Sequence, residues 1–336
     1  MDASADFEPP RWLRGGHAQS ILPRIGIARR RMRARAAPLL GASRERLVDC
    51  GDGVRLQAFE ALQSRSDPTR PLAIFLHGWE GSADSPYVLS SAQALYAQGL
   101  DVVRLNLRDH GDTHHLNQEL FHSCRLTEVA RAIASLHVPR RTQPLMLVGF
   151  SLGGNFMLRV TAAAPGFDID VAQTVAISPV LDPARTLIAM EGRFNIYHAY
   201  FVRKWARSLR RKQQAWPDAY DFEAMLGNAD LRRMTEQMVL RHTEYQSLSN
   251  YLDGYALTGA RLAALAAPAT IITALDDPII PAADLAALAT SDRLEIVTTR
   301  YGGHCGFSPG LGQPSWVDEV IAARIPRPAS SSSQRS

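Results

Sequence analysis

The sequence of 336 residues contains only three cysteines, Cys50, Cys124 and Cys305. They lie far apart and include no CxxC pair, so neither a disulfide framework nor a thiolate metal site is indicated. Long hydrophobic runs are also missing. No stretch of about 18 uninterrupted apolar residues occurs, and residues 1–20 lack the apolar core of a signal peptide. We therefore expect a cytoplasmic protein.

Excess positive charge is confined to one segment. Residues 1–46 hold ten arginines against four acidic residues, although the net charge of the whole chain is only +4. The centre of this excess is the run RRRMRAR at 29–35. Alternating arginines favour a solvated edge strand, which they protect against edge-to-edge pairing. Peripheral association with an anionic membrane stays open, and nucleic acid binding is not expected because no recognition-helix or aromatic pattern accompanies the arginines.

Apolar runs alternate with amphipathic segments over much of the chain. Residues 47–50 and 54–59 flank a Gly-Asp-Gly turn and predict an antiparallel hairpin. Continuous apolar runs then alternate with helical segments, which indicates a mostly parallel central sheet with helices on both faces. The predicted strands lie at 72–76, 101–106, 144–148, 171–177, 269–275 and 294–298, and the predicted helices lie near 86–98, 124–137 and 153–164.

The interruption of this alternation predicts the organisation of the chain. Strand character stops after 177 and returns at 269, and the intervening residues are helical in pattern. The serine-rich end of the sequence is predicted to be disordered. We predict an N-terminal arm with a basic strand at 1–46, a first part of an α/β core at 47–182, a helical insertion at 183–260, a second part of the core at 261–325 and a disordered tail at 326–336.

A GxSxG motif, at residues 149–153, lies at the junction between an apolar strand and a helix. In that context the motif is typical of a nucleophile on a sharp strand-to-helix turn, where close backbone approach requires glycine on both sides. The helix that follows directs its amide dipoles toward an oxyanion formed at the serine. The sequence therefore predicts Ser151 as a nucleophile.

A serine hydroxyl needs an adjacent base, and that base needs a carboxylate to orient it. Asp276 and Asp277 follow the strand at 269–275, and His304 lies in a glycine-flanked loop after the strand at 294–298. The order Ser, Asp, His, with each residue after a strand, is that of the α/β-hydrolases. We assign His304 as the base and Asp277 as its carboxylate, because the acid before Pro-Ile-Ile-Pro occupies the usual turn position. Asp276 is expected to cap or brace the loop.

The loop after the first parallel strand supplies the second half of a predicted oxyanion hole. It contains His77-Gly78-Trp79, a glycine turn with free backbone amides. We predict that the backbone N–H groups of Trp79 and Leu152 are the two donors. His77 is expected to orient this loop by hydrogen bonds and not to act as a base.

A histidine-rich segment between 109 and 122 raises the question of a metal. Histidines four residues apart suit a metal only on one helix face, yet Gly111 and Asp112 favour a loop. The serine, histidine and aspartate already account for catalysis, so we expect neither a metal nor another cofactor. The role of these histidines, His110, His114, His115 and His122, stays open.

At these residues the chain resembles the α/β-hydrolase superfamily and, more narrowly, the YheT-like hydrolases, which are relatives of animal abhydrolases and of fungal medium-chain ethyl ester synthase/esterases. The resemblance implies an α/β-hydrolase fold and hydrolysis of short- or medium-chain acyl esters through an acyl-enzyme on Ser151, with Asp277 and His304. One departure is the sequence RDHG at 108–111, where relatives often carry an Arg-Gly pair. The matching blocks are WLRGGHAQS at 12–20, HG at 77–78 with GS at 81–82, NLR at 106–108, GFSLGGN at 149–155, DDP at 276–278 and GGHCGF at 302–307.

The expected substrate is a small-molecule acyl ester, with lipid-derived esters among the candidates. A serine at the turn disfavours dehalogenase or epoxide hydrolase chemistry, in which a carboxylate attacks an alkyl carbon. The insertion at 183–260 is expected to cap the site, with its aromatic side chains around the acyl chain. Two alternatives stay open: an acyltransferase or ester synthase that uses the same three residues, and a non-catalytic ligand-binding protein on the same fold. The sequence leaves the oligomeric state open.

Overall fold

The computed structural model of the protein describes residues 2–4, 7–65, 67–191, 196–227 and 230–326. Within these ranges one sheet has the strand order β1-β9-β8-β7-β6-β4-β5-β3-β2, and its neighbouring strands are parallel except in the pairs β2–β3 and β3–β5. The strands are β1 Asp2–Ser4, β2 Ser43–Asp49, β3 Arg55–Ala61, β4 Leu72–Leu76, β5 Asp101–Leu105, β6 Leu145–Phe150, β7 Val171–Ile177, β8 Ala269–Ala274 and β9 Leu294–Thr299.

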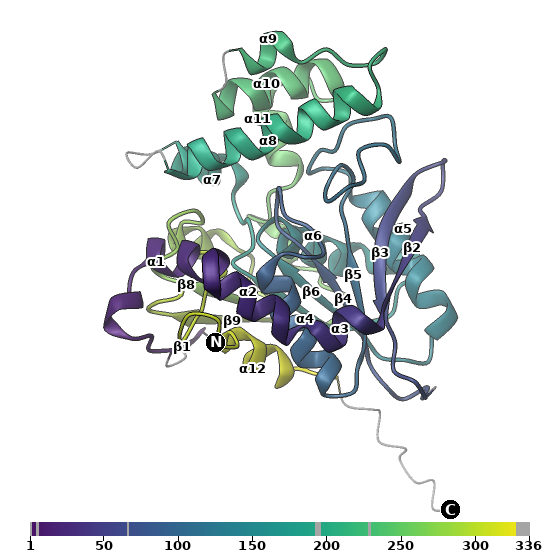
Figure 1. The fold of residues 1–336 in the computed structure, drawn as a ribbon, viewed down its shortest axis with the longest axis vertical. Coiled ribbons are helices and arrows are strands. Elements are labelled where there is room, and N and C mark those ends of the chain that lie inside the picture. The colour runs from purple at the N-terminus through teal and green to yellow at the C-terminus, as the bar shows by residue number, and fades with distance from the viewer. Residues whose placement is uncertain (1, 5–6, 66, 192–195, 228–229, 327–336) are drawn as a thin grey trace, which may run out of the picture.

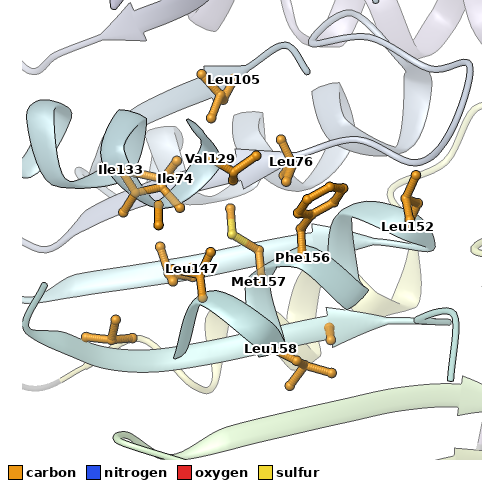
Figure 2. Close-up of a cluster of buried hydrophobic side chains, with 14 of the residues drawn as sticks. Ile74, Leu76, Leu105, Val129, Ile133, Leu147, Leu152, Phe156, Met157 and Leu158 are labelled. Atoms are coloured by element: carbon orange, nitrogen blue, oxygen red, sulfur yellow. The ribbon is translucent and has the colours of Figure 1, made fainter. Parts of the chain in front are cut away.

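The continuous apolar strands are buried on both faces of the sheet, as their sequences predict. Ile74 in β4 contacts the cluster that includes α5 (Leu126–His137) and α6 (Leu152–Ala163). Its neighbour Phe75 points to the other face, toward α4 (Pro86–Ala97) and α12 (Trp316–Ala322). Figure 2 shows part of the first cluster, with Phe156 and Met157 of α6 facing the sheet. The parallel sheet with helices on both faces is therefore confirmed.

The antiparallel hairpin is also confirmed. β2 and β3 pair over their whole length, and β3 continues the sheet by pairing with β5. Gly51, Asp52 and Gly53 all have positive φ angles, 78°, 55° and 76°. This tight turn explains the Gly-Asp-Gly sequence, because glycine adopts the left-handed region without a steric cost.

The prediction of a basic strand near the N-terminus is wrong. The arginine run lies in α2 (Gly26–Arg35), between α1 (Gly16–Ile21) and α3 (Ala37–Ala42). Ala28, Met32 and Ala36 are buried, and their spacing of four places them on one helix face. That face lies against α4, and the arginines at 29, 30, 31 and 33 are exposed. The alternating arginines thus belong to the exposed, polar face of a helix and not to a strand.

The inserted segment forms a group of helices above the sheet (Figure 1). Its cluster of buried side chains includes Trp205, Leu209 and Met234. Among the described residues, none of the helices is long and apolar enough to cross a membrane. The predicted tail lies outside the described residues except for Pro326. The helices of the inserted segment are α7 Pro183–Met190, α8 Ile196–Ala215, α9 Glu223–Leu226, α10 Leu231–His242 and α11 Leu248–Gly254.

Candidate active site

Ser151 lies on the sharp turn between β6 and α6. Its backbone is in an unusual conformation, with φ 54° and ψ −119°. A Cβ atom on Gly149 would lie 2.3 Å from the carbonyl oxygen of Gly153, and one on Gly153 would lie 2.4 Å from the carbonyl oxygen of His77. Both glycines of the GxSxG motif are thus required by close backbone contacts, and the turn leaves the serine hydroxyl at the carboxyl end of the sheet.

The structure brings the three predicted residues together. His304 Nε2 lies 2.9 Å from Ser151 Oγ, and His304 Nδ1 lies 2.9 Å from Asp277 Oδ2. The other oxygen of Asp277 accepts the backbone N–H groups of Ile279 and Ile280, at 2.8 and 3.0 Å. The Asp277 side chain is fully buried and that of His304 nearly so. With Nδ1–H directed to the carboxylate, Nε2 can accept the serine proton.

Asp276 occupies the bracing position that the sequence predicted. Its Oδ1 accepts the backbone N–H of Gly303 at 2.8 Å, which connects the loop after β8 to the loop that carries His304. Burial raises the pKa of the Asp276 carboxyl.

The charge environment of His304 favours its protonated form. Burial by itself lowers the pKa of the imidazole, whereas the neighbouring Cys305 and Asp277 raise it. The net shift of the pKa is upward. A base with a raised pKa holds a proton more firmly, so an imidazolium at this position would be stabilised.

The predicted oxyanion loop lies directly against the serine. A Cβ atom on Gly78 would lie 3.0 Å from Ser151 Cβ. In the described part of the chain, neither Trp79 N–H nor Leu152 N–H has a hydrogen-bond partner. Leu152 is also the first residue of α6, so its amide carries part of the positive end of the helix dipole. Both N–H groups are therefore free to donate a hydrogen bond to an acceptor beside Ser151.

Two buried histidines hold the peptide units on either side of Trp79. His77 Nδ1 lies 2.7 Å from the carbonyl oxygen of Gly78, and its Nε2 accepts the N–H of Leu107 at 3.2 Å. His110 Nε2 accepts the N–H of Glu80 at 3.1 Å. Burial lowers the pKa of His77 well below its usual range and that of His110 to about 4, so both rings are neutral. The orienting role of His77 was predicted, whereas that of His110 was not.

Helix α8 covers the oxyanion loop from the inserted segment. The Trp79 ring stacks on Phe201, with centroids 5.1 Å apart, and meets Trp205 edge-on at 5.4 Å. Lys204 Nζ donates a hydrogen bond to the carbonyl oxygen of Glu80 at 2.8 Å. The aromatic residues of the insertion thus contact the loop that carries a predicted oxyanion donor.

The sequence RDHG at 108–111, which departs from the family pattern, holds helix α8 in place. Asp109 has a left-handed backbone, with φ 58°, and its carboxylate lies 2.8 Å from Lys212 Nζ of α8. Gly111 has φ 64°, in the left-handed region, and a Cβ atom there would also lie 2.7 Å from Asn106 Nδ2, so this turn favours glycine. A neighbouring cavity of about 20 Å³, room for one water molecule, does not reach Ser151. It is lined by Glu80, Asp109, His110, Leu120, Phe121, Trp205, Ser208, Leu209, Lys212 and Met238.

Two of the three remaining histidines of this segment contact protein groups. His114 Nε2 lies 2.8 Å from Ser208 Oγ, and His122 Nε2 lies 3.8 Å from the carboxylate of Glu244. His115 is exposed. Across the described residues, no three histidine, cysteine, aspartate or glutamate side chains form a group that could hold a metal ion.

The chain belongs to the alpha/beta hydrolase family, whose family model matches residues 73–320. The predicted α/β-hydrolase fold is confirmed. Within this family the chain is similar to the "Putative esterase YheT" of Escherichia coli (strain K12), with 28% identity over 96% of this chain and 93% of that protein. It is also 20% identical to the phospholipase ABHD3 of Bos taurus, over 83% of this chain and 70% of that protein.

Solved structures show the same fold. The crystal structure of the 2,6-dihydroxy-pseudo-oxynicotine hydrolase matches with a TM-score of 0.56 and 16% sequence identity, over 93% of this chain and 81% of that chain. This similarity concerns the arrangement of strands and helices.

Proposed function

We propose that the protein is a serine esterase that hydrolyses carboxylic esters through an acyl-enzyme. The observation that carries this proposal is the chain of contacts from Ser151 Oγ to His304 and on to Asp277, each 2.9 Å long. A histidine with a purely structural role has no need of both a buried carboxylate and a serine on a strained turn as its partners. A histidine that acts as the base in nucleophilic catalysis needs both.

The proposed reaction has two halves. His304 Nε2 takes the proton of Ser151 as its oxygen bonds to the ester carbonyl carbon, and Asp277 stabilises the resulting imidazolium. The carbonyl oxygen becomes an oxyanion that accepts hydrogen bonds from Trp79 N–H and Leu152 N–H. The tetrahedral species then collapses: the bond to the alkoxy oxygen breaks, His304 returns the proton to it, and the alcohol leaves. Water deacylates the serine by the same steps and releases the acid.

The proposed substrates are esters of short- or medium-chain acids, with lipid-derived esters included. This is supported by the names of the two relatives, a putative esterase and a phospholipase, since the first name denotes action on an ester and the second action on a lipid. The stacked rings of Trp79 and Phe201, both partly exposed, offer an apolar surface suited to an acyl chain.

The test is turnover of p-nitrophenyl esters of increasing acyl chain length by the wild type and by Ser151→Ala. We expect turnover by the wild type and none by purified, folded Ser151→Ala. Turnover that survives in that variant contradicts the proposal. Product analysis with ethanol present separates hydrolysis from acyl transfer, because a transferase forms the ethyl ester.

A further inference from the structure

We propose that the N-terminal helix α1, together with Arg24, positions the catalytic base, and that Ser20 and Arg24 are positioning residues for His304. This inference rests on the proposed function, because it gives α1 a part in the reaction of the same site.

Both main-chain polar groups of His304 are held by the N-terminal arm. The backbone N–H of His304 donates a hydrogen bond to Ser20 Oγ at 2.8 Å. Its carbonyl oxygen accepts a hydrogen bond from Arg24 Nη2 at 2.6 Å. Ser20 is nearly fully buried, and its own hydroxyl donates to the carbonyl oxygen of Gly16, so the acceptor lone pairs are directed toward His304. Neither bond involves the imidazole, which stays available to Ser151 and Asp277.

Gln19 holds the next part of the loop after β9 that carries His304, called the base loop below. This side chain is fully buried, and its amide bonds Ser308 twice: it accepts the N–H of Ser308 at 2.7 Å and donates to the carbonyl oxygen of Ser308 at 3.0 Å. A Cβ atom on Gly306 would lie 2.2 Å from the carbonyl oxygen of Gln19. The base loop therefore follows the surface of α1 at backbone-to-backbone distance.

Helix α1 also contacts the loop that carries the acid. A Cβ atom on Gly16 would lie 1.9 Å from the carbonyl oxygen of Asp276, and one on Gly303 would lie 2.3 Å from the carbonyl oxygen of Gly16. The backbone of Gly16 is therefore wedged between the acid loop and the base loop. The position of the Gly16 backbone therefore determines how far apart the loop with Asp277 and the loop with His304 lie. It thereby determines the distance between Asp277 and His304.

The base loop needs such support because its own backbone is strained. Cys305 and Phe307 have φ angles of 55° and 43°, in the left-handed region that side chains other than glycine rarely adopt. A strained loop persists only where its surroundings fix it. Displacement of a reacting group by about 1 Å costs on the order of a hundredfold in rate. Loss of the arm's hydrogen bonds is therefore expected to affect the chemical step more than substrate binding.

The experiment compares Ser20→Ala with a matched variant, Ser43→Ala. Ser43 makes the same pair of bonds away from the site: its hydroxyl donates to the carbonyl oxygen of Leu39, four residues earlier, and accepts from Arg104 Nη2. We expect Ser20→Ala to lower kcat by roughly 10- to 100-fold with KM within about twofold. Ser20→Thr, which keeps the hydroxyl, is expected to restore most of kcat, and Ser43→Ala to leave kcat unchanged.

The outcomes are distinguishable from failure of the proposed function. If the wild type turns over no ester, the proposed function fails. If the wild type is active and Ser20→Ala retains the kcat of Ser43→Ala, the positioning proposal is overturned. If Ser20→Ala does not fold, Arg24→Met tests the same proposal. Arg24 is only partly buried, so this substitution is less disruptive to folding. A fall in kcat with an unchanged unfolding temperature supports the proposal, and an unchanged kcat overturns it.

Discussion

The buried ion pair between Lys212 and Asp109 is expected to determine how firmly the inserted helices attach to the core. Lys212 Nζ contacts Asp109 Oδ1 at 2.8 Å and the carbonyl oxygens of Asn117 and Glu119 at 2.6 and 3.1 Å. Both charged side chains are at least 95% buried. Lys212→Met keeps the length and packing of the side chain, removes the charge and leaves Asp109 as an uncompensated buried carboxylate.

The expected cost follows from this geometry. Removal of one partner of a buried ion pair typically destabilises a protein by about 3–5 kcal/mol. Burial raises the pKa of Asp109, and Lys212 opposes that shift, so the pKa of Asp109 rises further in Lys212→Met. A carboxyl whose native pKa exceeds its unfolded pKa weakens the fold as pH rises through that interval, and protonation removes the penalty. The deficit should therefore be largest near pH 8 and smaller near pH 4.

The assay is urea-induced unfolding at several pH values, with hydrogen exchange to locate the affected helices. Arg207→Met, an exposed substitution on the same helix, is the control and should change the free energy of unfolding by less than about 0.5 kcal/mol. Asp109→Asn added to Lys212→Met should recover part of the loss, since asparagine tolerates the left-handed backbone and still accepts the N–H of Phe121. A Lys212→Met deficit below about 1 kcal/mol at pH 8 would refute the reasoning.

Three further predictions concern the site. In the proposed reaction the neutral imidazole of His304 is the base, and its pKa is raised, so kcat/KM should increase with pH with a midpoint above 6.5; a midpoint at or below 6.5 would contradict this. Burial raises the pKa of Glu80 from 4.5 to about 7, so the fold loses stability as pH rises through that interval, and thermal melts of Glu80→Gln should show a gain of about 1–3 kcal/mol at pH 8 and little at pH 4.5. A gain of equal size at both pH values would argue against that cause. Gly153→Ala places a Cβ atom 2.4 Å from the carbonyl oxygen of His77, so we expect a shift of the turn and a loss of ester turnover of at least tenfold, measured against wild type.

The central sheet and the candidate site were predictable because local sequence carries their signals. The strands β4 to β6 are short apolar runs, and the glycines at 149 and 153 are required by contacts within the turn itself. The order of Ser151, Asp277 and His304 then indicated which loops would meet. That they meet at bonding distance depends on the whole sheet, so only the structure shows it.

The features that could not be predicted from the sequence depend on contacts between residues that are far apart in the chain. An alternation of arginines does not distinguish an edge strand from the polar side of a helix, and the contact of α2 with α4 decides it. The link between His110 and Glu80 joins loops after two different strands. The bond between Ser20 and His304 spans 284 residues. The motif at 12–20 marked that region as characteristic of the family, yet nothing in it indicated which loop it would contact.

The most direct measurement of the central claim is mass spectrometry after treatment with a fluorophosphonate, which reacts with an activated serine. The account predicts a single adduct on Ser151 that is absent in Ser151→Ala and forms at least roughly a thousandfold more slowly in His304→Ala. An unmodified Ser151 in the wild type, or labelling of Ser151 at the same rate without the histidine, would contradict it.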